Sequence, residues 1–301
     1  MKLLQAATRP RGALHQSLKP APRPAASHHH YSSTTTTTTT DWNAANYLRF
    51  AAERTRPARD LLAQVHLPAS ATRRVVDLGC GPANSTALLA ARFPGAQLTG
   101  VDGSPDMLAR ARRALPGARF VQADLREYRV PEGVDLAFSN AALHWLPEGV
   151  VGEVVRGVVE GLRPGGVFAM QVPDNLAEAS HVAMGETARL EGAEWRGRFE
   201  GEAGEGRARV PAPGEWYDAL SGLGEVDVWH TVYYHRLDGH EAIVAWLRES
   251  GLRPYLDAVG EGLKEKFEAE YLKRIEKAYP LNADGSVLLR FPRLFVVCVR
   301  K

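Results

Sequence analysis

Two glycines one residue apart follow a short apolar run and an acid in the stretch "VVDLGCGPANST", which extends from Val75 to Thr86. A strand, a glycine turn and the beginning of a helix, in this order, bind a small ligand in several classes of protein. Glycine at such a turn lets the backbone approach the ligand closely. The residues around the turn indicate which ligand that is.

The turn lacks the residues that would bind phosphate. A Walker A loop has Lys and then Ser or Thr after its last glycine, whereas Gly81 is followed by Pro-Ala-Asn. The dinucleotide pattern G-x-G-x-x-G/A fits Gly79 and Gly81, but Asn84 stands at its third position. Asp77 would also bring a negative charge close to a pyrophosphate. S-adenosylmethionine carries an ammonium and a sulfonium instead of phosphate, so it suits this turn better.

Further polar residues stand at the ends of the next predicted strands. Asp102 follows the turn by about twenty residues, where a carboxylate can accept hydrogen bonds from both ribose hydroxyls. Asp124 is placed to meet the adenine amino group, and Asn140 to face the methionine part and the substrate. Any one of these acids alone could be an ordinary loop carboxylate. The predicted cofactor-binding residues are Asp77, Gly79, Gly81, Asp102, Asp124 and Asn140.

Alternating strands and helices must position these residues. The patterns predict strands over 75–78, 97–101, 119–122, 134–139, 167–172, 226–235 and 287–300, and helices over 46–65, 84–93, 104–115, 148–161, 241–250 and 262–278. A turn over 162–166 should lead into the fifth strand. This order predicts an α/β, Rossmann-like fold with a mostly parallel seven-stranded sheet, helices on both faces and ligands at the carboxyl ends of the strands. Insertions at about 175–215 and 237–285 are predicted to form a helical cap over the site.

The composition narrows the choice of partners. Five of the 37 Lys and Arg residues lie before position 41, which leaves 32 against 35 acidic residues in 41–301. A slightly acidic domain argues against a nucleic-acid partner. No apolar run reaches the roughly 18 residues of a membrane helix. Cys80 and Cys298 form no C-x-x-C pair, so neither a metal site nor a disulfide framework is predicted. We expect a monomer.

Residues 1–40 differ in composition from the rest of the chain. They contain Arg, Lys, several prolines and a threonine tract but no acid, which predicts a disordered leader before a folded domain over 41–301. Such a composition is also typical of a mitochondrial transit peptide. The alternative is a low-complexity tail that carries no address, and the expected location is therefore mitochondrial or cytoplasmic.

Segments along the whole domain resemble one family. They are "DWN", "AAERTRPA", "DLGCGPANSTALL", "GVDGSPDML", "NAALHWLP", "VPDN", "YYH", "GLRPYL", "YPL" and "FPRLFVV". The chain resembles class I S-adenosylmethionine-dependent methyltransferases and, more narrowly, the trans-aconitate 2-methyltransferase family. The resemblance implies methylation of one carboxylate of trans-aconitate, a small polycarboxylate. Two residues depart from the family pattern: Ala83 stands where Gly is usual, and His144 where bacterial members have Gln.

A substrate with three carboxylates needs cations, and the planar fork of Arg matches a carboxylate through two hydrogen bonds. The candidate substrate-binding residues are Arg54, Arg56, Tyr233, Tyr234, His235, Arg253 and Arg293. Strand alternation allows only one of the two tyrosines to face the site. Because a carboxylate is already ionised, no acid or base is predicted, and Asn140, Trp145 and His235 would position the reactants. Two alternatives remain: methylation of another small acid or hydroxyl, and a non-catalytic S-adenosylmethionine-binding protein.

Overall fold

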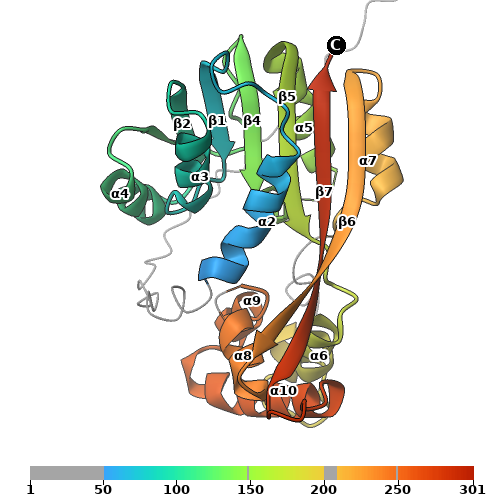
Figure 1. The fold of residues 1–301 in the computed structure, drawn as a ribbon. Coiled ribbons are helices and arrows are strands. Elements are labelled where there is room, and N and C mark those ends of the chain that lie inside the picture. Colours follow the sequence, from blue (N-terminus) through green and yellow to red (C-terminus); the bar gives the residue numbers. More distant parts are fainter. Residues whose placement is uncertain (1–50, 148, 200–208, 249) are drawn as a thin grey trace, which may run out of the picture. The chain divides into compact units, whose positions relative to one another are not determined.

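The computed structural model describes residues 51–147, 149–199, 209–248 and 250–301. Seven strands form one sheet (Figure 1). They are β1 (Arg74–Leu78), β2 (Gln97–Asp102), β3 (Arg119–Gln122), β4 (Val134–Asn140), β5 (Leu162–Pro173), β6 (Gly224–Leu237) and β7 (Val287–Arg300). Their order across the sheet is β3-β2-β1-β4-β5-β7-β6. The predicted α/β fold with a mostly parallel seven-stranded sheet is confirmed.

The directions of the strands divide the sheet into two parts. β1 to β5 are parallel to one another, whereas β7 runs antiparallel between β5 and β6. The strand order reverses between β1 and β4, and open α/β sheets bind ligands at the carboxyl ends beside such a reversal. The fifth strand begins earlier than predicted, because Leu162 already pairs with Val134. The predicted turn therefore lies inside β5, at a register shift where Gly165 has a φ of 71°.

Helices follow the strands as the sequence pattern indicates. They are α2 (Ala51–Ala63), α3 (Asn84–Arg92), α4 (Pro105–Ala114), α5 (Val151–Gly161), α6 (Ala179–Ala188), α7 (Pro213–Leu220), α8 (His240–Arg248), α9 (Arg253–Val259) and α10 (Lys264–Ala278). Short 3-10 turns are η1 (Leu143–Trp145), η2 (Arg196–Phe199) and η4 (Glu261–Leu263). Helix α4 begins as its sequence dictates: the Ser104 hydroxyl accepts a hydrogen bond from the Met107 amide, and Pro105 occupies the first turn.

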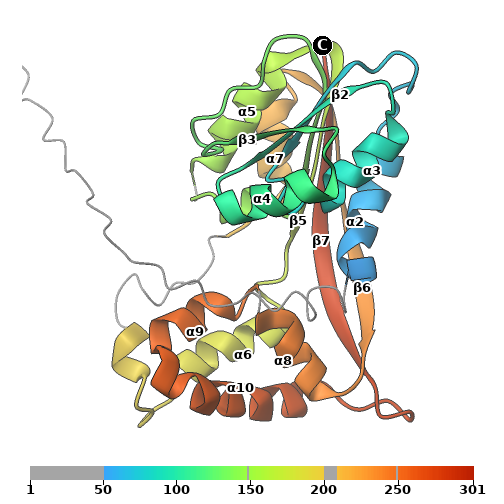
Figure 2. The same ribbon diagram turned by 90° about the vertical axis from the view of Figure 1, so that its left-hand side faces the viewer.

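The two faces of the sheet pack against different helices (Figure 2). On one face, Leu61 of α2 and Leu89 of α3 belong to a buried cluster with Val75 of β1. On the other face, Val155 of α5 packs in a cluster with Val76, the next residue of β1. Successive strand residues point to opposite faces, so this apolar pair anchors both layers. The prediction of helices on both faces is confirmed.

A third core lies outside these two layers, in the helical cap formed by α6, α8, α9 and α10. Phe267, Tyr271 and Ile275 lie on one face of α10 at four-residue spacing, and all three are fully buried. Leu237 of β6 and Phe291 of β7 belong to the same cluster. Strands β6 and β7 thus run from the sheet into the cap (Figure 1). The antiparallel pair of β6 and β7 therefore connects the cap to the sheet.

The predicted leader over 1–40 and the domain boundary at 41 lie outside the described residues. In the described part of the chain, every helix is too short or too polar to cross a membrane. No group of His, Cys, Asp and Glu suited to a metal ion occurs among those same residues.

Candidate active site

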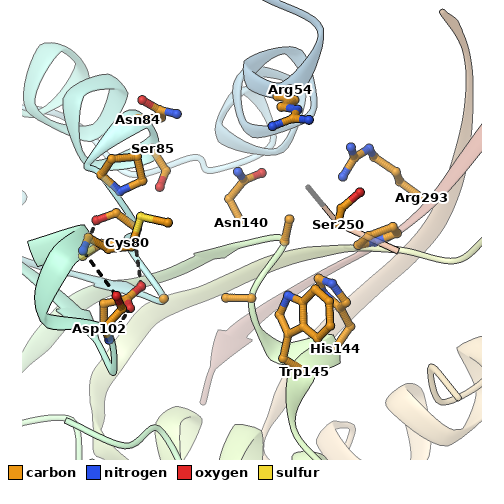
Figure 3. A pocket seen from close by; sticks show the side chains of 18 of the residues that line it. Arg54, Cys80, Asn84, Ser85, Asp102, Asn140, His144, Trp145, Ser250 and Arg293 are labelled. Atoms are coloured by element: carbon orange, nitrogen blue, oxygen red, sulfur yellow. Dashed lines mark hydrogen bonds between the residues drawn. The ribbon is translucent and has the colours of Figure 1, made fainter. Parts of the chain in front are cut away.

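A cavity of about 450 Å³ lies at the carboxyl ends of the parallel strands (Figure 3). Its loop side consists of Gly79, Cys80, Gly81, Asn84, Ser85 and Asp102. Its arginine side consists of Arg54, Trp246, Ser250, Arg253, Phe291 and Arg293. Asn140, His144 and Trp145 also line the cavity, and Figure 3 shows Asn140 between the two sides. Small-ligand pockets commonly have roughly 300–1,000 Å³, so this cavity has the usual size.

The two glycines of the loop serve different purposes. A Cβ on Gly79 would lie 2.1 Å from the Cβ of Ala142, so close packing requires glycine there. Gly81 has a φ of 53°, and a Cβ added to it would meet nothing within 4 Å. Gly81 therefore presents bare backbone to open space, as a residue that cradles a ligand should. Ala83 has a φ of 76°, so the position where the family usually has Gly does adopt the left-handed conformation.

Asp102 is held in the cavity wall by the backbone of the loop and of α4. Its Oδ2 accepts a hydrogen bond from the Gly81 amide at 2.9 Å, and its Oδ1 accepts one from the Ser104 amide at 2.9 Å. Each carboxylate oxygen can accept a further bond. The arrangement fits the predicted role as acceptor for two ribose hydroxyls.

Asp77 lies beneath the loop rather than in the cavity lining. Its Oδ2 accepts hydrogen bonds from the Ser85 hydroxyl at 2.8 Å and the Thr86 hydroxyl at 2.6 Å. Its Oδ1 is buried without a hydrogen-bond partner among the described residues, and burial raises the pKa of Asp77 to about 6. We therefore revise its role: Asp77 ties the loop to the first turn of α3 and does not face the cavity.

Asp124 lines an adjoining pocket instead of the main cavity. The two pockets share Ala142 and Trp145, so they meet beside the loop that follows β4. The Asp124 carboxylate pairs with Arg126, which lowers the pKa of Asp124 to about 2. This position suits a contact with the adenine end of a cofactor whose ribose is near Asp102.

Asn140 belongs to a chain of side chains that crosses from the loop side to the arginine side. Gln171 Nε2 donates a hydrogen bond to Asn140 Oδ1. Arg293 Nη1 donates one to Gln171 Oε1 at 3.0 Å. Gln171 is fully buried on β5, where it is the register partner of Asn140. Gln171 was not among the predicted site residues, although its place at the end of a predicted strand was an available signal.

Three of the predicted arginines line the cavity, and aromatic rings hold two of them. Arg293 is only 5% exposed and lies over the Phe291 ring at 5.0 Å from its centroid. Arg54 lies over Trp246 at 5.4 Å and donates a hydrogen bond to the Trp246 carbonyl. Arg253, which opens α9, faces Asp257 at 3.7 Å. Cations held over aromatic faces keep their charge while their donors remain available.

Four predicted substrate residues lie outside the lining, three of them on β6 and the fourth, Arg56, on α2. Tyr233 donates to Asp60 on α2 at 2.7 Å, and Arg56 lies over the Tyr233 ring. Tyr234, on the opposite face of the strand, is 59% exposed. His235 stacks on Trp246, and burial together with the nearby arginines lowers the pKa of His235 to about 4. We therefore revise these roles: neither tyrosine faces the cavity, and His235 packs behind Trp246, which lines the cavity.

Several lining residues were not predicted as site residues. Cys80 and Ser85 lie in the glycine stretch itself, so the motif could have indicated them. Trp246 and Ser250 come from the end of α8 and the segment after it, and reach the cavity only because the cap packs as it does. No local pattern indicates that packing.

Fold and site together define a class I S-adenosylmethionine-dependent methyltransferase: a parallel sheet with an antiparallel β7, a glycine loop after β1 and an acid at the end of β2. A family model for a methyltransferase domain matches residues 75–166. The fold resembles the YcgJ protein of Bacillus subtilis, with a TM-score of 0.52 and 16% identity over 84% of this chain and 99% of that one. The fold also resembles a putative methyltransferase of Bacillus halodurans C-125, with a TM-score of 0.50 and 17% identity over 81% of this chain and 98% of that one.

Closer relatives specify the family. A trans-aconitate 2-methyltransferase of Rhodopseudomonas palustris BisB18 is 49% identical over 86% of this chain and 99% of its own length. One of Rhizobium leguminosarum bv. trifolii is 48% identical over the same shares. The chain belongs to the trans-aconitate 2-methyltransferase family.

Proposed function

We propose that the protein transfers a methyl group from S-adenosylmethionine to one carboxylate of trans-aconitate, giving the monomethyl ester and S-adenosylhomocysteine. One observation carries the proposal: a single cavity joins a loop side suited to the cofactor to an arginine side suited to a polycarboxylate. The names of the relatives support the same substrate.

The residues of the loop side fit the cofactor. Gly81 offers bare backbone, Asp102 offers two acceptors for the ribose, and Asp124 lies in the adjoining pocket toward the adenine. S-adenosylmethionine, when bound, supplies a methyl group on a positively charged sulfur. Because an isolated carboxylate has a pKa of about 4, the substrate oxygen is a nucleophile at neutral pH without a base. The protein has to align that oxygen and exclude water.

The arginine side supplies what that alignment needs. Arg293 is buried, so its attraction to a carboxylate is screened less than that of an exposed cation. Arg54 and Arg253 approach from α2 and α9, which gives up to three cations for three carboxylates. Trp246 and Phe291 add apolar surface that displaces water from the space between the arginines.

A transfer assay tests the proposal. Purified protein is incubated with labelled S-adenosylmethionine and a panel of di- and tricarboxylates, and the methyl ester is identified by mass spectrometry. We expect trans-aconitate to give the highest kcat/KM, and Tyr234→Ala, outside the cavity, to match the parent. If the methyl group were transferred only to another acid, that acid would replace trans-aconitate as the proposed substrate. Cofactor binding without transfer to any acid would favour the non-catalytic alternative.

One observation favours a second candidate, methylation of a hydroxyl. His144 lines the cavity, and an imidazole there could accept a hydroxyl proton. The pH profile of kcat/KM separates the two reactions. Carboxylate methylation predicts a flat profile from about pH 6 to 9. A rate that falls below about pH 7 in the parent but not in His144→Gln would support hydroxyl methylation instead.

The remaining expectations concern partners and location. We expect a monomer without affinity for nucleic acid, which light scattering and a DNA-binding titration would check. The expected location is mitochondrial or cytoplasmic, and residues 1–40 fused to a fluorescent reporter would test whether they direct mitochondrial import.

A further inference from the structure

Gln171 lies between a residue that faces the cofactor and a residue that faces the substrate. It occupies the end of β5, beside Asn140 on β4, and it is fully buried. Its side chain bonds to Asn140 on one side and to Arg293 on the other. Its backbone carbonyl accepts a hydrogen bond from the Ala141 amide at 2.9 Å. Gln171 therefore holds both the side chain of Asn140 and the chain segment that follows it.

The chemistry of the three side chains fixes the direction of every bond. A guanidinium only donates hydrogen bonds, so Arg293 must face the oxygen of the Gln171 amide. The Gln171 nitrogen is then turned toward Asn140, which must offer its own oxygen. The Asn140 nitrogen is left on the cavity side, and among the described residues it has no hydrogen-bond partner. Arg293 thus sets the orientation of an amide it does not touch.

We propose that Gln171 is a positioning residue that locks the amide of Asn140 with its donor toward the reacting carboxylate, and that couples this orientation to Arg293. The inference rests on the proposed function, because a donor at that point suits a carboxylate oxygen and not a cationic group. Asn140 thereby helps to align the attacking oxygen, while Arg293 binds the substrate.

Two substitutions at Gln171 separate positioning from packing. Gln171→Met keeps the volume and removes both hydrogen bonds, so we expect kcat/KM to fall roughly tenfold to hundredfold. Gln171→Glu keeps the contact with Arg293 but offers Asn140 only acceptors, so the Asn140 amide must turn its oxygen to the cavity. We expect Gln171→Glu to lose at least as much kcat/KM as Gln171→Met. A residue needed only for packing would give the opposite order.

A double-mutant cycle tests the route through Asn140. In the Asn140→Ala background, Gln171→Met should lower kcat less than about threefold, although it still raises KM through Arg293. Ser139→Ala is the matched control: it removes a buried hydrogen bond, from the Ser139 hydroxyl to the Leu78 carbonyl, one residue away and off the cavity. It should lower the melting temperature and leave kcat and KM unchanged.

Binding without turnover provides the independent readout. Affinity for trans-aconitate is measured by calorimetry in the presence of S-adenosylhomocysteine, and we expect both Gln171 variants to weaken it at least tenfold. Parent-like kinetics in Gln171→Met, or kcat losses that multiply fully with those of Asn140→Ala, would overturn the inference. If the parent binds trans-aconitate in this complex but does not methylate it, the proposed function fails, and the affinities still decide the role of Gln171.

Discussion

The two sides of the cavity are built in opposite ways. The loop side comes from one continuous stretch, residues 79–102, and backbone amides hold its carboxylate in place. The arginine side comes from α2, α8, α9 and β7, and aromatic rings hold two of its cations. A backbone turn is set by local sequence, whereas a cation over a ring depends on how the cap packs. The loop side is thus defined locally and the arginine side by the tertiary fold.

This difference matches the chemistry of the two ligands. A cofactor shared by many enzymes can be bound by one transferable motif, while the substrate is specific to each family. The cavity therefore predicts that substitutions on one side leave the other ligand's affinity almost unchanged. Kinetic and binding constants of variants on each side test that separation.

Substitution of Arg293 should change KM for trans-aconitate more than any other substitution in the cavity. Truncating a buried cation that pairs with a carboxylate typically costs about 2–4 kcal/mol, much of it from the carboxylate left unpaired. We expect Arg293→Ala to raise KM for trans-aconitate by roughly 10²-fold, measured by steady-state kinetics, with the dissociation constant of S-adenosylhomocysteine changed less than about threefold. Arg293→Lys should rescue poorly because it lacks the planar fork.

Two controls sharpen this prediction. Arg253 is more exposed than Arg293, so Arg253→Ala should have a smaller effect on KM. Arg56 lies over Tyr233 outside the lining, and Arg56→Ala should leave KM unchanged. A parent-like KM in Arg293→Ala would remove Arg293 from the substrate site.

A buried group with a shifted pKa lies behind each side of the cavity, Asp77 behind one and His235 behind the other, and these two groups act on stability in opposite directions. Burial raises the pKa of Asp77, beneath the loop side, from 3.8 to about 6. The stability it contributes is complete below the unfolded pKa of 3.8 and is lost as the pH rises through about 6. The pKa of His235, behind the arginine side, falls from 6.5 to about 4. Its contribution is complete above 6.5 and is lost as the pH falls through about 4.

Urea unfolding at several pH values between about 4 and 7 separates the two groups. A shift of about two pKa units corresponds to roughly 3 kcal/mol at full development. Asp77→Asn should make the free energy of unfolding rise more steeply with pH than in the parent, and His235→Phe should make it rise less steeply. Identical slopes in the three proteins would show that neither group is ionised differently in the folded state.

Asp102 should dominate cofactor affinity. Hydrogen bonds to a charged acceptor contribute about 1.5–3 kcal/mol, so Asp102→Ala should raise the dissociation constant of S-adenosylhomocysteine at least tenfold. Calorimetric titration measures this, and circular dichroism checks that the domain remains folded. Asn84→Ala serves as a comparison on the same side. Unchanged affinity in Asp102→Ala would place the ribose elsewhere.

The elements that carry the loop side could be predicted from the sequence because their signals are local. The strand ends at Asp102 and Asn140, the glycine turn and the alternation of strands and helices follow from patterns a few residues long. Asp77 was the exception, since a carboxylate beside the loop could equally turn inward to Ser85 and Thr86, as it does. The local pattern predicted strand β1, but it did not indicate which groups the Asp77 carboxylate would bind.

The arginine side could be predicted only in part. Arg54, Arg253 and Arg293 were found through family segments, yet the same reasoning selected Arg56, Tyr233, Tyr234 and His235, which lie outside the lining. Their placement has a physical cause: one face of β6 packs against α2 and against the aromatic stack of His235 on Trp246, and the other face is exposed at Tyr234. Gln171 was missed because its role depends on cross-strand register.

Substitution of Ala83 should change stability least, because the cost of its backbone strain and the gain from packing its methyl group nearly cancel. Its φ of 76° costs an alanine about 1 kcal/mol relative to glycine. Its methyl group is 2% exposed and packs with Cys80, Leu108 and Phe120, which contributes about 0.8 kcal/mol. Ala83→Gly should therefore change the melting temperature by less than about 2 °C, measured by calorimetry. Ala141, with a φ of 54° and a less buried methyl group, lacks that compensation, so Ala141→Gly should be stabilised more. If Ala83→Gly proved the more stabilised of the two, the packing of its methyl group would contribute little, and strain alone would govern the loop.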